Sequence, residues 1–94
     1  MDAEPIPNAT VDRAIVYWLQ AASFKTHAEA NKLRARLLLL NLEAVIEKTS
    51  DKQQRDWYRV LVGPYQSRSK MAKTRSILAS IEIKSLVIKR KIGQ

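Results

Sequence analysis

The segment WYRVLVGPY, residues 57–65, alternates its side chains with the period of two that is typical of a β-strand with one buried face. The side chains predicted to face the core are those of Tyr58, Val60 and Val62. Trp57, Arg59 and Leu61 should then point outward together, with Trp57 and Arg59 substantially exposed. A guanidinium can bind a carboxylate through two parallel hydrogen bonds, and an indole offers a flat apolar surface. The pattern therefore predicts a surface that binds a ligand.

Composition excludes several kinds of site. The 94 residues suffice for one domain with two packed layers around a single core. The chain has no cysteine, which excludes disulfides, thiol catalysis and thiolate metal ligands. The only histidine, His27, is predicted to lie in the first turn of a helix, and the acidic residues show no recognisable pair for glycosidic cleavage. We therefore expect no metal site, no cofactor and no enzymatic activity.

Positive charge is concentrated in the second half of the chain. The formal net charge is +8, with −1 over residues 1–47 and +9 over residues 48–94. This asymmetry indicates an anionic partner, for which nucleic acid, anionic lipid and an acidic glycan are the candidates. The alternative is a basic surface that contacts only solvent and has no binding partner.

The start of the chain shows little folding signal. Residues 1–13 are acidic, contain two prolines and show no periodicity, so we predict a flexible linker there and a folded domain over residues 14–94. No apolar run reaches the roughly 18 residues that a membrane-spanning helix needs. The N-terminus also lacks the pattern of a signal peptide. Any membrane anchor is therefore expected outside this chain.

Two helices and four strands are predicted between residues 14 and 91. The predicted strands cover residues 14–20, 43–49, 57–62 and 85–91. The first helix should begin near residue 27, after the capping box formed by Thr26 and Glu29, and close at a left-handed Asn41. The second helix should begin near residue 68, capped by Ser67. The predicted buried helical positions include Leu33, Leu37 and Leu78.

The order β-α-β-β-α-β predicts an α+β fold of the ferredoxin-like type, a four-stranded antiparallel sheet with both helices on one face. Right-handed crossovers place the first and third strands in the middle of the sheet. Gly63-Pro64 is predicted to end the third strand, because proline cannot donate to a sheet ladder. The other face, which we call the open face, would carry Trp57 and Arg59 and meet the ligand.

Two motifs resemble the sporulation-related repeat (SPOR) domain family, over roughly residues 14–91. That family shows an aromatic-x-Arg-Val-x-Val-Gly-Pro-aromatic segment on its third strand, which WYRVLVGPY matches. It also shows a Gln-x-Gly-Ser-Phe segment near the end of its first strand. The matching residues here are Gln20, Ser23 and Phe24, with Ala22 in place of the glycine. Asn41 replaces a second glycine of the family, and asparagine adopts the left-handed conformation at modest cost.

The resemblance implies a non-catalytic module that binds bacterial cell-wall peptidoglycan. Such domains favour denuded glycan strands, from which amidases have removed the stem peptides, and many belong to proteins of division sites. The implied location is the periplasm or cell envelope, as a monomeric C-terminal domain of a larger, membrane-anchored protein. The positions that match the family's glycan contacts are Gln20, Ser23, Trp57 and Arg59.

The chemistry of these residue types suits such a ligand. Removing a stem peptide leaves a lactyl carboxylate for Arg59, while Trp57 can pack on a sugar ring and Gln20 can both donate and accept hydrogen bonds. The alternatives are packing of Trp57 under the 50–56 loop and ordinary turn hydrogen bonding by Gln20 and Ser23. If Gln20 points outward, strand parity turns two further residues outward. These are Val16 and Trp18.

Two other function classes stay open. RNA-recognition domains of the same fold stack bases on aromatic residues of the two central strands, which Trp18 and Trp57 would suit. Residues 57–65 lack the Lys/Arg-Gly-aromatic-Gly/Ala-aromatic pattern expected there, so RNA is the second hypothesis and nucleic acid is not the favoured partner. The third hypothesis is a protein-interaction domain that docks through Leu38 and Leu39.

Overall fold

The computed structural model describes residues 15–92, so the linker predicted over residues 1–13 lies outside the described residues. The elements are β1 (Ile15–Phe24), α2 (His27–Leu39), β2 (Ala44–Ser50), β3 (Asp56–Tyr65), α3 (Arg68–Ser80) and β4 (Leu86–Lys91). This order confirms the predicted succession of strands and helices. Both helices begin where the sequence predicted, at His27 and Arg68.

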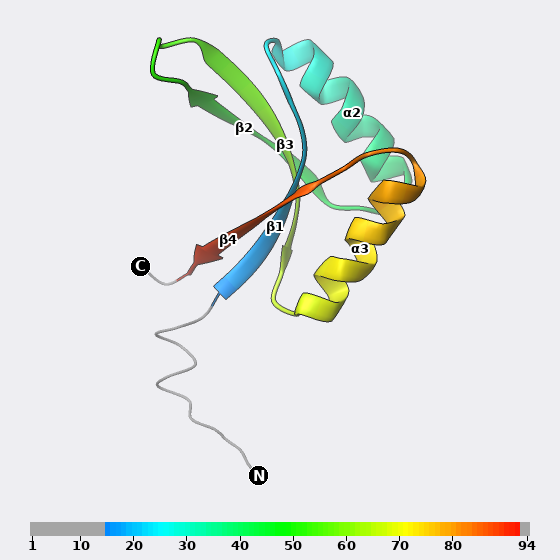
Figure 1. Cartoon of the computed structure of the whole chain (residues 1–94). Helices are drawn as coiled ribbons and strands as arrows, with labels where there is room; N and C mark the ends of the chain where they lie inside the picture. The colour runs from blue at the N-terminus through cyan, green and yellow to red at the C-terminus, as the bar shows by residue number, and fades with distance from the viewer. Residues whose placement is uncertain (1–14, 93–94) are drawn as a thin grey trace.

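The four strands form one antiparallel sheet in the order β2-β3-β1-β4. β1 and β3 are therefore the central pair, as predicted. The sheet is twisted, and α2 and α3 both lie on the same side of it (Figure 1). The predicted ferredoxin-like α+β fold is confirmed, and the opposite side of the sheet is the open face.

β3 is longer than predicted, because it passes through Gly63 and Pro64 and pairs Tyr65 with Tyr17 of β1. The register shifts at this point, so the two residues lie in a β-bulge, which tolerates a proline. The prediction that Gly63-Pro64 ends the strand was wrong for this reason. Gly63 has a φ of 141°, and a Cβ there would lie 3.0 Å from the Tyr17 carbonyl oxygen, so the position requires glycine.

Both ends of α2 follow the sequence signals. The Glu29 backbone N–H donates to Thr26 Oγ1 at 3.2 Å, which confirms Thr26 as the N-cap, and the Thr26 hydroxyl donates to Glu29 Oε1 at 2.9 Å in place of the second bond of a capping box. At the other end Asn41 has a φ of 63°, and the Leu42 N–H donates to the Leu37 carbonyl at 3.0 Å. This is a Schellman motif, and it confirms the left-handed asparagine.

α3 ends in the same motif, with Glu82 in the left-handed position at a φ of 67°. The Ile83 N–H donates to the Leu78 carbonyl at 2.9 Å. A Cβ is strained in this conformation, which glycine adopts freely. We expect Glu82→Gly to raise the free energy of unfolding by about 1 kcal/mol and the melting temperature by about 4–8 °C. Thermal denaturation measures both.

Asn41→Gly is the matched comparison for Glu82→Gly. It should stabilise the domain less, because asparagine already tolerates the left-handed conformation. A lower melting temperature for Glu82→Gly would mean that the glutamate side chain stabilises the fold, and would contradict the argument from strain.

The core lies between the helices and the sheet. The predicted core residues that are buried are Val60, Val62, Leu33, Leu37 and Leu78, which confirms their assignment. Tyr58 is half-buried instead. Its ring packs edge-on against His27 at a centroid distance of 5.7 Å, at the margin of the core, because α2 begins there.

The orientation of β4 is set by its pairing with β1. Leu86 pairs with Gln20 of β1, and Ile88 pairs with Trp18, so both side chains lie on the open face and not in the core. Leu86 is 63% exposed. Val87 pairs with the buried Leu19 and takes the side facing the helices. The run Leu-Val-Ile has no polar–apolar alternation, so only pairing with β1 fixes its parity.

Candidate functional site on the open face

A bulge in β1 places Gln20 and Ser23 on the same face of the sheet. In a regular strand, residues three apart point to opposite faces. Here Gln20 pairs with Leu61 of β3 and Ser23 pairs with Arg59, so β1 has one more residue than β3 between these two pairs. Arg59 and Leu61 share a face, and Gln20 and Ser23 therefore lie on it with them.

The same bulge explains why alanine is acceptable where the family motif has glycine. Ala22 pairs with Val60 and packs against the core. The non-glycine residues with positive φ in the described chain are Asn41, Gln54 and Glu82, so position 22 does not need glycine's freedom. The direction of Ser23, which the sequence left open, is set by its pairing with Arg59.

Arg59 is held on the open face by two partners. Its Nη1 donates to Gln20 Oε1 at 3.3 Å, and its Nη2 donates to Glu47 Oε1. Glu47 lies directly opposite Arg59 on β2. The Arg59 side chain is only 26% exposed, so the prediction of substantial exposure was wrong, although the predicted face is correct. Sequence alternation gives the direction of a side chain but not what covers it.

Arg90 joins the same carboxylate from the opposite edge of the sheet. Its Nη1 donates to Glu47 Oε2 and its Nη2 to Glu47 Oε1, both at 3.0 Å. Glu47 lies on the edge strand β2 and Arg90 on the edge strand β4, so this arginine–glutamate cluster of Glu47, Arg59 and Arg90 spans the open face. Hydrogen bonds first from Arg90 and then from Arg59 lower the pKa of Glu47 to about 2.

Two apolar residues are buried on the open face. Leu61 exposes 1% of its surface and Val16 exposes 5%. Leu61 is next but one to Arg59 on β3, and Val16 pairs with Arg90. Arginine stems can cover apolar surface while the charged groups stay near water, and we attribute the burial to them. Leu61 thus faces outward as predicted without being exposed.

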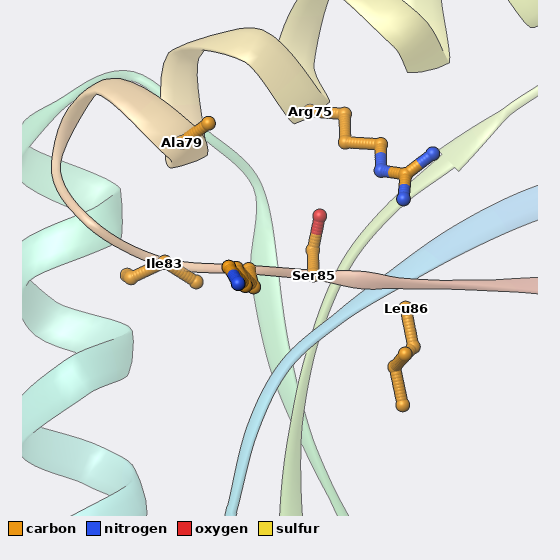
Figure 2. A pocket seen from close by; sticks show the side chains of 6 residues that line it. Arg75, Ala79, Ile83, Ser85 and Leu86 are labelled. Carbon is orange, nitrogen blue, oxygen red and sulfur yellow. The ribbon is translucent and has the colours of Figure 1, made fainter.

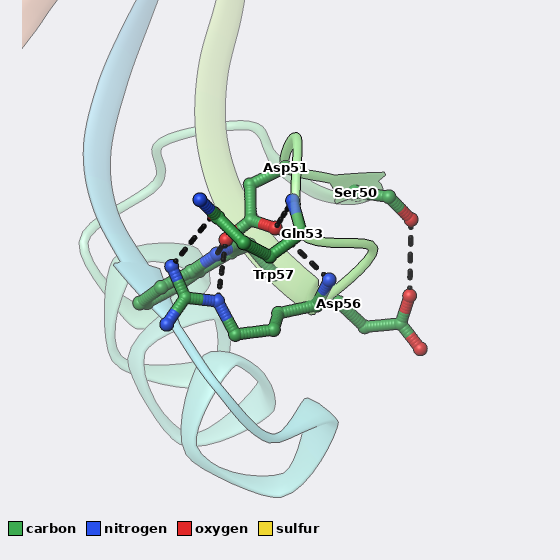
Figure 3. A network of polar contacts seen from close by, with 6 residues as sticks. Ser50, Asp51, Gln53, Asp56 and Trp57 are labelled. Carbon is green, nitrogen blue, oxygen red and sulfur yellow. Dashed lines mark hydrogen bonds and ion pairs between the residues drawn. The ribbon is translucent and has the colours of Figure 1, made fainter.

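Trp57 lies at the start of β3, against the loop that joins β2 to β3. Its indole N–H donates to Asp51 Oδ2 at 3.0 Å, within a network of polar contacts around that carboxylate (Figure 3). The Lys25 ammonium lies 5.7 Å from the indole ring centroid. The indole is half-buried, so the expected exposure was wrong here too, and the alternative of contact with the 50–56 loop is correct in part.

The loop carboxylate that holds Trp57 is itself fixed by its neighbours. Asp51 Oδ1 accepts from the backbone N–H groups of Gln53 and Arg55, each at 2.9 Å. Arg55 Nε donates to Oδ2 at 2.8 Å. The hydrogen bond from Trp57, followed by that from the Arg55 backbone, lowers the pKa of Asp51 to about 2. The loop therefore presents an ionised acceptor to the indole at neutral pH.

Trp18 extends the open face beyond the polar residues. It pairs with Ile88, and a Cβ at Gly63 would lie 3.3 Å from its ring atom Cε3, so the indole packs over that glycine. Leu86, on the same face, is largely exposed. The open face thus combines a polar half around Arg59 with an apolar half around Trp18.

The fold and this face define a class of protein: a small α+β domain with a helix-covered core and a polar and aromatic surface on the open side of its sheet. The SPOR domain model matches residues 14–89, and the chain belongs to this family. The match confirms the resemblance that the two motifs indicated.

A solved structure with the same fold is the solution structure of the peptidoglycan-binding domain of the B. subtilis cell wall lytic enzyme CwlC. It is 18% identical in sequence, with a TM-score of 0.65, over 81% of this chain and 90% of that chain. At this level of identity the similarity supports the fold. No curated protein matches the sequence at a significant level.

Proposed function

We propose that this domain is a non-catalytic module that binds peptidoglycan glycan strands through its open face. The observation that carries the proposal is that Gln20, Ser23 and Arg59 share that face through the pairing of β1 with β3, with Trp57 two residues before Arg59 on the same face of β3. Membership of the SPOR family supports it, and so does the similar fold of the CwlC domain, which is a peptidoglycan-binding domain.

The location that follows from this function is the cell envelope. We place the domain in the periplasm, as a monomeric part of a larger protein anchored to the membrane elsewhere in its chain. No helix within residues 15–92 is long and apolar enough to cross a membrane.

The proposed ligand is a denuded glycan strand, whose muramic acid residues each carry a free lactyl carboxylate. Arg59 and Arg90 would bind that carboxylate. For this contact, at least one of the two arginines must break its hydrogen bonds to Glu47. Ser23 stands exposed beside Arg59 and can bond a sugar hydroxyl, as can Gln20. Trp57 offers an indole edge or face to the sugar ring.

Co-sedimentation tests glycan binding against the alternative of RNA binding. The domain is mixed with untreated and with amidase-treated sacculi across a salt series, beside a titration with single-stranded RNA. We expect more domain to sediment after amidase treatment and binding to weaken gently with salt, because few charges pair at once. RNA binding would fall steeply with salt, with a slope set by the phosphates neutralised. Equal sedimentation with both kinds of sacculi, together with tight, salt-sensitive RNA binding, would contradict glycan binding and support RNA binding.

Trp57→Ala is expected to weaken binding to soluble denuded glycan about fivefold, because a stacking surface worth about 1 kcal/mol is lost. Trp57→Phe keeps a ring but loses the hydrogen bond to Asp51, and should retain most of the affinity. Isothermal titration calorimetry measures both. An equal loss in the two variants would mean that the indole N–H matters through the loop and that stacking does not contribute.

Ala22→Gly is expected to leave glycan affinity unchanged, because Ala22 packs toward the core and the bulge does not need a glycine there. The free energy of unfolding should fall by about 0.5–1 kcal/mol, because glycine in a strand loses more conformational entropy on folding. The same titration and a urea unfolding curve check the two parts. A large gain in affinity would mean that alanine misdirects Ser23.

A further inference from the structure

A second candidate site lies apart from the proposed glycan contacts, between the last turns of α3 and the start of β4. A cavity of about 400 Å³ is lined there by Arg75, Ala79, Ile83, Lys84, Ser85 and Leu86 (Figure 2). Leu86 is the one lining residue that also lies on the open face, and none of the lining residues is a proposed glycan contact. Its chemistry therefore has to be explained separately.

Ser85 is the unusual member of this cavity. The residue is 4% exposed, and its Oγ has no hydrogen-bond partner among the described residues. Figure 2 shows the hydroxyl of Ser85, the residue before β4, pointing toward the side of the cavity where the Arg75 guanidinium lies. Buried hydroxyl groups nearly always have a partner, so one that points into a cavity beside a cation indicates a ligand atom.

The charged groups around Ser85 have one sign. Arg75 and Lys84 line the cavity, and no side-chain hydrogen bond or ion pair from either is found within residues 15–92. No acidic residue is among the lining residues. The polar side chains of the cavity can thus supply a guanidinium fork, an ammonium group and a hydroxyl. All three can donate hydrogen bonds, and only the hydroxyl can also accept one. Ala79 and Ile83 form an apolar wall beside them.

We propose that this cavity binds the oxyanion of an organic ligand, a phosphate or a carboxylate. Arg75 binds two of its oxygens, the Ser85 hydroxyl donates to one oxygen, and Lys84 adds charge. The apolar wall of Ala79 and Ile83 contacts the carbon part of the ligand. Ser85 and its cavity would form this site whether or not the open face binds glycan.

The test is titration of the ¹⁵N-labelled domain with sodium phosphate and, separately, with sodium acetate, at constant ionic strength. We expect saturable shifts of the Lys84, Ser85 and Leu86 amides with at least one anion, and the stronger of the two identifies phosphate or carboxylate as the group bound. Arg75→Gln should weaken that binding about tenfold, and Ser85→Ala should weaken it severalfold. Lys73→Gln, which removes the same charge from an exposed position of the same helix, should leave it unchanged.

The melting temperature of Ser85→Ala gives a second readout that needs no ligand. Removing a buried hydroxyl that has no partner should leave the melting temperature unchanged or raise it in buffer free of both anions. A lower melting temperature would mean that the hydroxyl serves the fold and would overturn its assignment to a ligand. Shifts that do not saturate, or that respond equally to Arg75→Gln and Lys73→Gln, would reduce the cavity to a general basic surface and overturn the proposal.

Discussion

Arg59→Ala is expected to lower the affinity for denuded glycan strands by about 10- to 100-fold, while binding to untreated sacculi falls less. A charge-assisted hydrogen bond between a guanidinium and a partly desolvated carboxylate contributes about 1.5–3 kcal/mol, and each 1.4 kcal/mol is a factor of ten. The variant also leaves Glu47 beside the ligand with one arginine fewer to neutralise it. Calorimetric titration with glycan fragments of both kinds measures the difference.

Two control variants separate a lost contact from a lost charge or a damaged fold. Arg36→Ala removes the same charge from an exposed position in the last turn of α2 and should leave binding unchanged. Arg59→Lys keeps the charge but not the guanidinium fork, so its glycan affinity should lie between those of Arg59→Ala and Arg36→Ala. Equal losses in Arg36→Ala and Arg59→Ala, with both variants folded by circular dichroism, would show that only net charge matters and would remove Arg59 from the site.

The fold was predictable because its signals are local. The signals at the helix ends act within one helical turn, and the structure confirms the predicted helix starts after Thr26 and Ser67 and the left-handed residue Asn41. Strand alternation also placed Arg59 on the correct face, because the helices cover the opposite side of β3. Signals of this kind depend only on residues a few positions apart.

The features that were not predicted correctly, or not predicted at all, depend on contacts between distant strands. The parity of β4 depends on its pairing with β1, and the run from Leu86 to Ile88 has no alternation of its own to show it. The exposure of Arg59 was overestimated because Glu47 and Gln20, which cover it, lie on two other strands. Neither arrangement follows from a pattern within one strand.

The candidate site was predicted in part. Gln20 and Ser23 were found through the family motif, although their common face depends on a β1 bulge that alternation alone would not suggest. Glu47 and Arg90 were missed. Glu47 alternates with Ile46, which packs against the core, on a short edge strand, and this is a usable signal, whereas Arg90 lies between two lysines and shows none.

Glu47→Gln is expected to raise the affinity for denuded glycan by about five- to tenfold. Glu47 accepts from both arginines that the ligand carboxylate would use, so it acts as an internal competitor. At a separation of about 4 Å near a protein surface, two like charges repel by a few kcal/mol at most, and solvent screening reduces this to about 1 kcal/mol. Glutamine keeps the size of the side chain and can still accept one hydrogen bond.

The lowered pKa of Glu47 determines how this effect depends on pH. With a pKa of about 2, Glu47 stays ionised at all pH values above about 4, so mild acid does not relieve the competition. Because the folded-state pKa lies below the ordinary value of 4.5, the ionised group stabilises the fold above about pH 4.5, and that contribution is lost as the pH falls toward 2. Glu47→Gln should therefore be less stable than the parent by about 1 kcal/mol at pH 7 and equal to it near pH 2.

The direction of the affinity change decides between two roles for Glu47. If it competes with the ligand, the gain should be largest for strands that carry the lactyl carboxylate and small for untreated sacculi. Glu82→Gln, which removes the same charge from the exposed loop after α3, should give no gain. A loss of affinity for both kinds of glycan would mean that Glu47 holds Arg59 and Arg90 in the arrangement that the ligand needs, and the competition hypothesis would be rejected. Measuring unfolding curves and titrations on the same samples keeps the two effects apart, because the stability loss is predicted whichever role is correct.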